Sequence, residues 1–375
     1  MITARAYSSI TAIERAAWNA CFPEELEDWD YYRAVEQSGM AGFQWRYLAL
    51  FEDQRLVAAA VAFTTAYALD TTVQGLGKRL TEGLRRRWPR LLDIRLYALG
   101  SPVAEQCHVG TAGHIDPQRR PLLLRELLVL ARRDADQAGI GLLAVKDAAQ
   151  QDGQWLHACE QAGLQSMPSL PGGVLPITFG SVDAYLGSLG KSTRKDLRRT
   201  LRGPGPRLEW RRSVDDVLPR MMALYDSTLA RSDLSFERLS PGYFQQVLEQ
   251  LGERAVCVLY WLDDELVAFN LLLLDRHRLV DKFFAHDLER TRAHNLYVRS
   301  WLANVDYCIE QAIPIYACGQ AGYASKLRLG CGFVGHTLFF RHRHPLCNGL
   351  LRLLKPLIRP DRGDAAMAAA ISETR

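Results

Sequence analysis

The sequence predicts an α/β (α+β) chain of two duplicated units, each with a mixed central β-sheet flanked by helices. Two pairs of similar segments, which occur in the same order in both halves of the chain, predict this class. The segments LALFEDQRLVAAAVAF, from Leu48, and VLYWLDDELVAFNLLL, from Val258, align at an offset of 210 residues. Each reads as an apolar run, a short acidic turn and a second apolar run, which is typical of a β-hairpin. Further on, RDADQAGIGLLAV and YCIEQAIPIYACG both read as a helix end running into a strand, and a glycine-bearing turn follows each.

The elements of the first half follow from local patterns. Residues 1–40 are predicted to be helical and residues 43–70 to form the first hairpin. A basic amphipathic stretch over 80–100 leads into a strand near 94–99. Residues 121–139 predict a strong helix, because Pro121 suits its first turn and Gly139 its C-terminal end.

The breaker-rich segment MPSLPGGVLP places the boundary between the halves within residues 165–180. We therefore predict an N-terminal domain over 1–170, a C-terminal catalytic and donor-binding domain over 175–345, and a basic amphipathic tail over 346–375. The elements expected in the second half are helices at 214–231, 241–252, 294–312 and 321–329, a hairpin at 254–274, and strands at 278–285, 313–318 and 333–342. A surface helix is expected over 346–358, and the final residues are expected to fray.

Bulk composition indicates an ordinary globular protein. With 375 residues the chain fits two domains, and its 48% hydrophobic and 23% charged residues exclude a disordered or collagen-like chain. The N-terminus lacks the pattern of a signal peptide, and no apolar stretch is long enough to span a bilayer. The eight cysteines are scattered without a CxxC pair, which favours reduced thiols. These features predict a cytoplasmic protein, with peripheral contact at the inner face of the membrane through the tail as the alternative.

Positive charge is concentrated just after the boundary. Residues 191–212 hold nine basic and two acidic side chains, whereas the formal net charge of the whole chain is only +4. We interpret this segment as a site for an anionic substrate, and the alternative is a solvated helix face. The candidate anion-binding residues are Lys191, Arg194, Lys195, Arg198 and Arg199.

Two further segments predict catalysis. In CGQAGYASKLRLG, three side chains at helical spacing share one face: Gln320, a candidate cofactor-binding residue, and the candidate catalytic residues Tyr323 and Lys326. A tyrosine there can protonate a leaving group, and a lysine can stabilise an oxyanion. The alternative is a helix packed by its tyrosine.

The other segment is DKFFAHD, which brings Asp281 and His286 to a strand end as candidate proton acceptors. A predicted helix start follows it, where backbone amides and basic side chains can cradle phosphates. The residues of that cradle are Arg290, Arg292, His294 and Asn295. The cluster His342, His344 and Cys347 offers too few ligands for a metal ion, so we predict no metal site.

These segments resemble the GNAT acyltransferase fold as it occurs in Fem-type aminoacyl transferases and FemAB-like acetyltransferase domains. The resemblance covers most of residues 20–342, and the first half is similar to the degenerate partner domain of such a tandem. The resemblance rests on four segments of the sequence: KSTRKDLRRTLR, YWLDDELVAFNLLL, LVDKFFAHDLERTRAHNLYVRSWLANVDYCIEQAI and CGQAGYASKLRLGCGF. The usual glycine-containing cofactor loop, (R/Q)xxGx(G/A), is absent, and RTRAHN from Arg290 takes its place.

The resemblance implies an N-acyltransferase with tandem GNAT-like domains, in which an amine attacks the donor directly without a covalent enzyme intermediate. Acyl-CoA is the expected co-substrate, and aminoacyl-tRNA is the alternative. A tRNA is an expected partner only if aminoacyl-tRNA is the donor. No covalently bound cofactor is expected. The acceptor would be a small-molecule or cell-envelope amine that enters between the domains. A non-catalytic protein that binds anionic lipid or nucleic acid is the alternative from another class.

Overall fold

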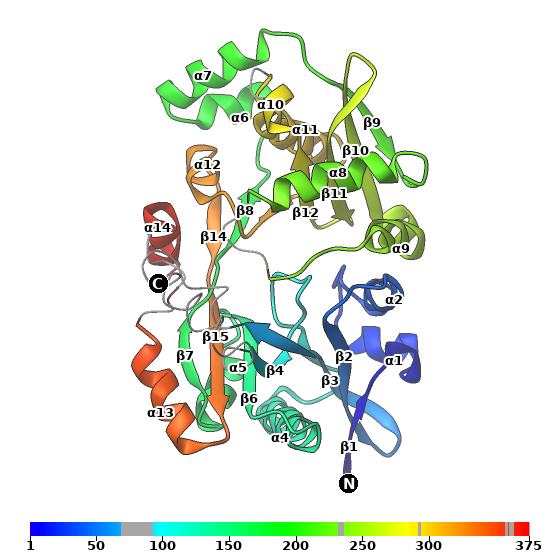
Figure 1. The fold of residues 1–375 in the computed structure, drawn as a ribbon, viewed down its shortest axis with the longest axis vertical. Coiled ribbons are helices and arrows are strands. Elements are labelled where there is room, and N and C mark those ends of the chain that lie inside the picture. The colour runs from blue at the N-terminus through cyan, green and yellow to red at the C-terminus, as the bar shows by residue number, and fades with distance from the viewer. Residues whose placement is uncertain (69–92, 232–235, 292–293, 357–358, 360–363, 375) are drawn as a thin grey trace.

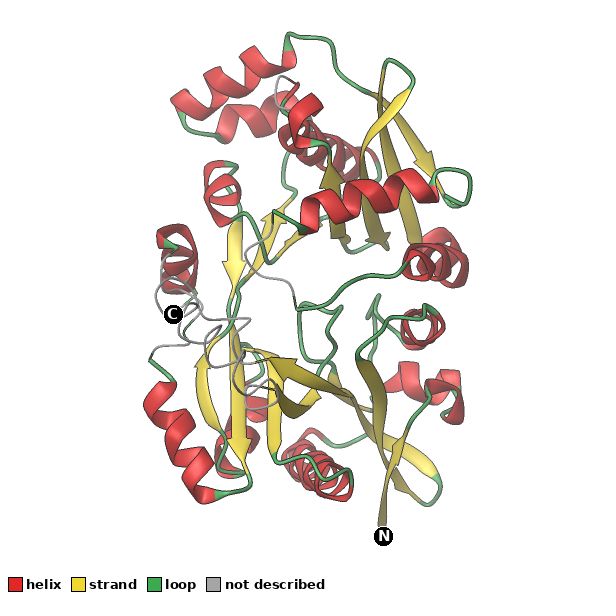
Figure 2. Ribbon diagram, viewed as in Figure 1, coloured by secondary structure: helices red, strands yellow, loops and turns green. Residues whose placement is uncertain are grey.

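The computed structural model describes the chain except for residues 69–92, 232–235, 292–293, 357–358, 360–363 and 375. The basic stretch predicted over 80–92 therefore lies outside the described residues. Two mixed β-sheets, each flanked by helices, stack end to end (Figure 1; Figure 2). The predicted fold class is confirmed.

Among the described residues, the first sheet holds eight strands. Seven of them follow the order β1 (Ile2–Tyr7), β2 (Phe43–Glu52), β3 (Arg55–Ala68), β4 (Asp93–Leu99), β6 (Leu142–Ala149), β15 (His336–His342) and β7 (Gln165–Pro168). The eighth, β5 (Val109–Thr111), pairs with β3. The helices of this half are α1 (Arg15–Cys21), α2 (Trp29–Gln37), α4 (Arg120–Gln137) and α5 (Gly153–Gln161).

The second sheet holds seven strands, in the order β14 (Gly332–Val334), β8 (Gly172–Pro176), β13 (Ile315–Gly319), β12 (Leu279–His286), β11 (Glu265–Leu274), β10 (Ala255–Leu262) and β9 (Arg207–Arg211). Its helices are α6 (Val182–Ser188), α7 (Lys191–Leu201), α8 (Leu218–Leu229), α9 (Pro241–Leu251), α10 (Leu288–Thr291), α11 (Leu296–Glu310) and α12 (Tyr323–Arg328). Two tail helices, α13 (Pro345–Leu354) and α14 (Ala365–Glu373), complete the chain.

The duplication read from the sequence is confirmed by the hairpins β2–β3 and β10–β11, which take equivalent places in their sheets. Both turns have two residues with positive φ, at 53–54 and 263–264, as a type I′ hairpin turn requires. The pairing register also shifts after Leu50 in the first hairpin and after Tyr260 in the second, again at an offset of 210. A matching bulge beside a matching turn indicates that the two hairpins are copies of one unit.

The two halves exchange one strand each. Strand β15 lies between β6 and β7 in the first sheet, while β8 lies between β13 and β14 in the second. The strand predicted over 333–342 is therefore two strands in different sheets, separated at Gly335. The domain limits at 170 and 175 stay a prediction, and β8, which directly follows β7 in the chain but joins the second sheet, lies across them.

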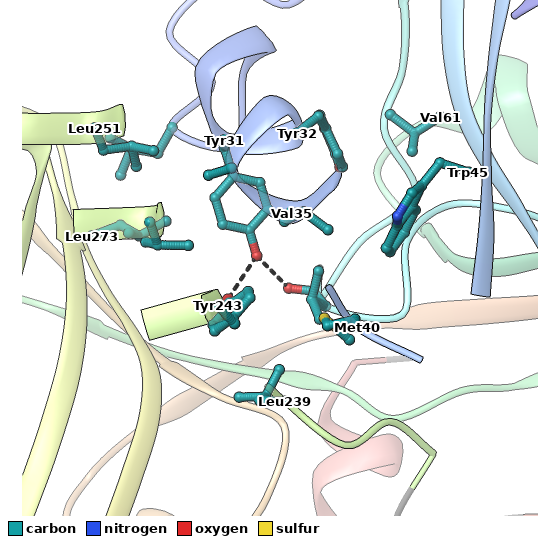
Figure 3. Close-up of a cluster of buried hydrophobic side chains, with 14 of the residues drawn as sticks. Tyr31, Tyr32, Val35, Met40, Trp45, Val61, Leu239, Tyr243, Leu251 and Leu273 are labelled. Atoms are coloured by element: carbon teal, nitrogen blue, oxygen red, sulfur yellow. Dashed lines mark hydrogen bonds between the residues drawn. The ribbon is translucent and has the colours of Figure 1, made fainter. Parts of the chain in front are cut away.

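A shared core also joins the halves. Helix α2 packs against α9, and one cluster of buried side chains draws on both halves. Within it the Tyr31 and Tyr243 hydroxyls form a hydrogen bond of 2.9 Å (Figure 3). The strand exchange and this core hold the two sheets in one arrangement, which fixes the geometry of any site between them.

The end of the chain differs from the sequence expectation of fraying. Residues 365–373 form helix α14, whose Asp364 caps the free amides of Ala366 and Met367. Met367, Ala370 and Ile371 are buried against Tyr323 of α12. The alanine-rich end is therefore helical because α12 gives it an apolar surface to pack on, which its local sequence does not reveal.

Candidate active site where the two halves meet

The parallel strands β12 and β13 part soon after they meet. They pair only at Leu279 with Tyr316 and at Val280 with Ala317, although β12 continues to His286. In the described chain no other strand takes the place of β13 beside the rest of β12. The matching strands of the first sheet, β4 and β6, stay paired from Leu96 to Leu99. The opening is therefore a property of the second sheet.

A β-bulge lies where the strands part. In the pairing of β12 with β11, Leu272 faces Asp281 and Leu271 faces Phe283, so Lys282 is the extra residue. The Lys282 side chain is only 5% exposed, yet the residue as a whole is partly exposed. The accessible surface is therefore that of its backbone, and bulges of this kind often aim backbone and side chains into active sites.

The bulge directs Lys282 toward the first half. Its ammonium group pairs with the buried Glu27 and donates to the Val103 carbonyl oxygen at 2.7 Å. It also lies 5.3 Å from the centre of the Tyr31 ring. Burial works to lower the pKa of Lys282, but the charge and hydrogen bond of Glu27, together with Tyr243 and Glu105, outweigh it and raise the pKa. This buried charge pair ties the parting strand to the opposite half.

Two side chains converge on Gly319 at the end of β13. A Cβ built on Gly319 would lie 3.1 Å from Glu105 Oε1 and 3.6 Å from Lys326 Nζ, and Gly319 has a φ of +83°. Lys326 is buried and donates to the Gly319 carbonyl oxygen at 2.6 Å. Glycine is needed here because of both the positive φ and the close approach of these side chains.

Glu105 comes from the loop that follows β4, so the first half supplies it. The residue is partly exposed, and among the described residues its carboxylate accepts no hydrogen bond. Burial of the carboxyl group raises the pKa of Glu105, and the charges of Lys282 and Lys326 offset only part of this effect. A carboxylate with a raised pKa and no hydrogen-bond donor among the described residues is suited to accept a proton.

Asp281 lies close to Gly319 and Lys326, but its carboxylate is already hydrogen-bonded. Its carboxylate accepts hydrogen bonds from Asn270 at 2.7 Å, Tyr316 at 2.8 Å and Asn304 at 3.3 Å. Burial raises the pKa of Asp281, while the bonds from Asn270 and Tyr316 act against it. The three donors fix the orientation of this side chain beneath the parting strands.

Gln320 and Tyr323 contact the linker between the halves. The Gln320 amide donates to the carbonyl oxygens of Glu105 at 2.9 Å and Leu170 at 3.0 Å. The Tyr323 hydroxyl donates to the Pro171 carbonyl oxygen at 3.1 Å, and its ring packs on α14. The structure thus brings Asp281, Gln320 and Lys326 together, with Tyr323 alongside.

The other predicted residues lie elsewhere. His286 is five residues beyond Asp281 on β12, roughly 16 Å away at the usual rise of a strand, where it stacks on Phe284 with ring centres 5.3 Å apart. Burial lowers the pKa of His286, and the charge of Arg231 lowers it further. Arg290 pairs with Glu265.

Near the start of α11, Nδ1 of His294 lies 3.4 Å from the Pro204 carbonyl oxygen, and Asn295 occupies the cap position with a φ of 47°. Arg292 lies outside the described residues.

The predicted anion-binding residues lie on α7, which begins at Lys191. Only Leu197 of this helix is buried. Arg199 pairs with Asp196 at 2.6 Å and Arg198 with Asp183 at 3.7 Å, whereas Lys191 and Lys195 are exposed. Helix α7 is therefore a basic surface beside the second sheet, partly neutralised at its C-terminal end.

A buried cluster of Glu25, Glu27 and His108 lies behind Lys282. Its ligand-type atoms lie within 4.8 Å of one another, so the three residues could hold a metal ion. His108 Nε2 lies 3.6 Å from a carboxylate oxygen of Glu25 and 3.5 Å from one of Glu27. The Tyr32 hydroxyl forms a hydrogen bond with His108 Nδ1. Arg278 and Lys282 already pair with the two carboxylates, so these two cations balance the charge of the cluster without a metal.

The His108 cluster predicts a pH-dependent stability. Burial works to lower the pKa of His108, but Glu25 and Glu27 outweigh it and raise the pKa above its usual value. Stability from this charge is therefore complete below about pH 6.5, the pKa of an unfolded histidine, and is lost as the pH rises through the folded pKa. We expect the melting temperature of the protein to fall over this range and the decline to be smaller in His108→Gln. An identical pH profile for the variant would contradict this role.

Sequence reasoning missed Glu105, Lys282, Glu27 and His108. Three of them lie in irregular segments of the first half, and only the packing of the halves brings these segments to β12. The bulge at Lys282 has no marker in DKFFAHD such as a glycine. No local signal could have identified these residues.

Comparison with known proteins supports the architecture. Residues 188–319, from the end of α6 to the end of β13, match the family described as acetyltransferase (GNAT) domain. The crystal structure of FemX superposes with a TM-score of 0.59 at 12% identity, covering 94% of this chain and 100% of that one. A tandem GNAT protein from the clavulanic acid biosynthesis pathway, solved without AcCoA, gives a TM-score of 0.53 at 12% identity, covering 92% and 99%. A search of curated proteins gives no match.

At such low identity the two structures establish the fold alone. The chain has a tandem GNAT-like fold, and the segment matched as a GNAT domain includes the bulge and the parting of β12 and β13. The opening therefore lies in the half for which sequence and structure both indicate a GNAT domain.

Proposed function

We propose that this protein is an N-acyltransferase that moves an acyl group from acyl-CoA to an amine by direct attack. The observation that carries the proposal is the parting of β12 and β13 at the Lys282 bulge. In a GNAT domain, parted parallel strands at this place admit the acyl carrier. The exposed backbone of β12 would then bind the carrier, as an added strand binds a sheet edge.

The groups around Gly319 supply the chemistry in this proposal. The acceptor amine enters between the halves, and Glu105 takes its proton as the new C–N bond forms. The C–S bond of the thioester then breaks, and CoA leaves as its thiolate. The Lys326 ammonium group and the β12 amides near the bulge stabilise the negative charge that develops on the acyl oxygen. Asp281 accepts hydrogen bonds from its three donors and so holds β12 against α11 beneath the reacting groups.

An assay of CoA release tests the proposal. The full-length protein is incubated with acetyl-CoA and a panel of amines, including amino sugars, amino acids and muropeptides, and the free thiol is measured. Release that depends on one class of amine supports the proposal. If no amine causes release of CoA but the protein consumes an aminoacyl-tRNA, the donor is aminoacyl-tRNA and not acyl-CoA.

Helix α7 is the observation that favours an extended anionic donor such as tRNA. Replacing Arg194 and Lys195 with glutamine should raise the KM of an anionic substrate and flatten its dependence on salt, because fewer counterions are released on binding. Arg276→Gln, at an exposed arginine far along the chain, is the matched control. If the KM of the variant equals that of the wild type at every salt concentration, α7 is a solvated helix that does not bind the substrate.

A further inference from the structure

Helix α13 presents a row of leucines to solvent. Leu346, Leu350 and Leu353 are 78%, 56% and 75% exposed, and their spacing places them on one face of the helix. We call these three residues the α13 leucine stripe. The opposite face holds the helix on the protein, where Asn348 accepts a hydrogen bond of 3.0 Å from Gln165 and Leu351 packs on the core. The stripe therefore points away from the fold.

The charged side chains of α13 and of the sequence that leads into it are all basic. Residues 311–360 contain no aspartate or glutamate, while Arg343, Arg352 and Lys355 lie in or beside α13. Among the described residues these three cations have no ion-pair partner. An apolar stripe flanked only by cations matches an anionic lipid surface, whereas a second copy of the helix would bring like charges together.

We propose that α13 docks this protein on an anionic lipid bilayer, with the leucine stripe inserted at the interface and the basic side chains among the headgroups. Among the described residues, no helix is long and apolar enough to cross a membrane. The proposal concerns a helix that lies in the plane of the bilayer surface, and it is independent of the proposed acyl transfer.

Cys347 offers a direct readout, because it lies in α13 and is exposed while the other seven cysteines are buried. An environment-sensitive dye attached to Cys347 of the full-length protein should shift to the blue with vesicles of phosphatidylcholine containing about one third phosphatidylglycerol. Vesicles of phosphatidylcholine alone should give little shift, because each basic residue near an anionic surface strengthens binding roughly fivefold.

Matched variants separate the contributions. Replacing Leu346, Leu350 and Leu353 with serine should abolish co-sedimentation with the anionic vesicles, because the helix loses its apolar face. The same change at Leu122 and Val129, which are exposed on α4, should leave binding intact. Equal binding by the stripe variant and the wild type would overturn the proposal. So would a dimer in sedimentation velocity that the stripe variant abolishes while vesicles bind neither protein.

Discussion

Replacing Lys282 with methionine should lower the free energy of unfolding by about 3–5 kcal/mol, the cost of leaving one partner of a buried ion pair alone. The Lys282 side chain is 5% exposed and that of Glu27 is 8% exposed, so water cannot replace the lost partner. The pair also joins β12 to the first half, so its loss should loosen the contact between the halves. Chemical denaturation of the purified protein measures the effect.

The double variant Lys282→Met with Glu27→Leu is the informative companion. It removes both charges, so we expect it to recover most of the lost stability, as replacement of complete buried pairs does elsewhere. Lys195→Met, at an exposed lysine of α7, should change stability by no more than about 0.5 kcal/mol. Additive losses in the double variant would show that the two side chains act independently.

Glu105→Gln should lower kcat by about 10²- to 10⁴-fold, the range for removal of a general base. Stability should change little, because no hydrogen bond among the described residues ends on this carboxylate. Since burial raises the pKa of Glu105, the wild-type kcat/KM should climb with pH above about 4.3, the usual value for glutamate.

The control for this change is Glu160→Gln, at an exposed glutamate of α5, which should leave kcat unchanged. The remaining activity of Glu105→Gln should lose the climb with pH, because the amide does not titrate. A kcat within about threefold of the wild type would remove Glu105 from the chemistry. His286 and Asp281 would then return as the candidate bases.

The sequence was informative where structure depends on local patterns. The hairpins, the helix 241–251 and the duplication were all predictable, because period-two runs, caps and turn residues act over a few positions. Lys326 and Gln320 could also be placed near a strand end, since the glycines after β13 mark the turn.

What the sequence could not reveal depends on the opposite half. The exchange of β8 and β15 joins residues far apart in the chain, and β-strands carry no mark of their partner. Glu105 and Glu27 are acidic residues in loops, where solvent exposure is the ordinary expectation. Only the shared core between α2 and α9 brings their loops to β12 and turns them into parts of a site.

Hydrogen exchange of the full-length protein with and without acetyl-CoA tests the central claim most directly, because the claim concerns backbone amides of β12. We predict that acetyl-CoA slows exchange of the amides of residues 281–286, where β12 has left β13, and of the turn 318–322. The matching strands of the first sheet, β4 and β6, should show no change. Unchanged exchange over 281–286 while acetyl transfer proceeds would contradict the account, and so would protection confined to the first sheet.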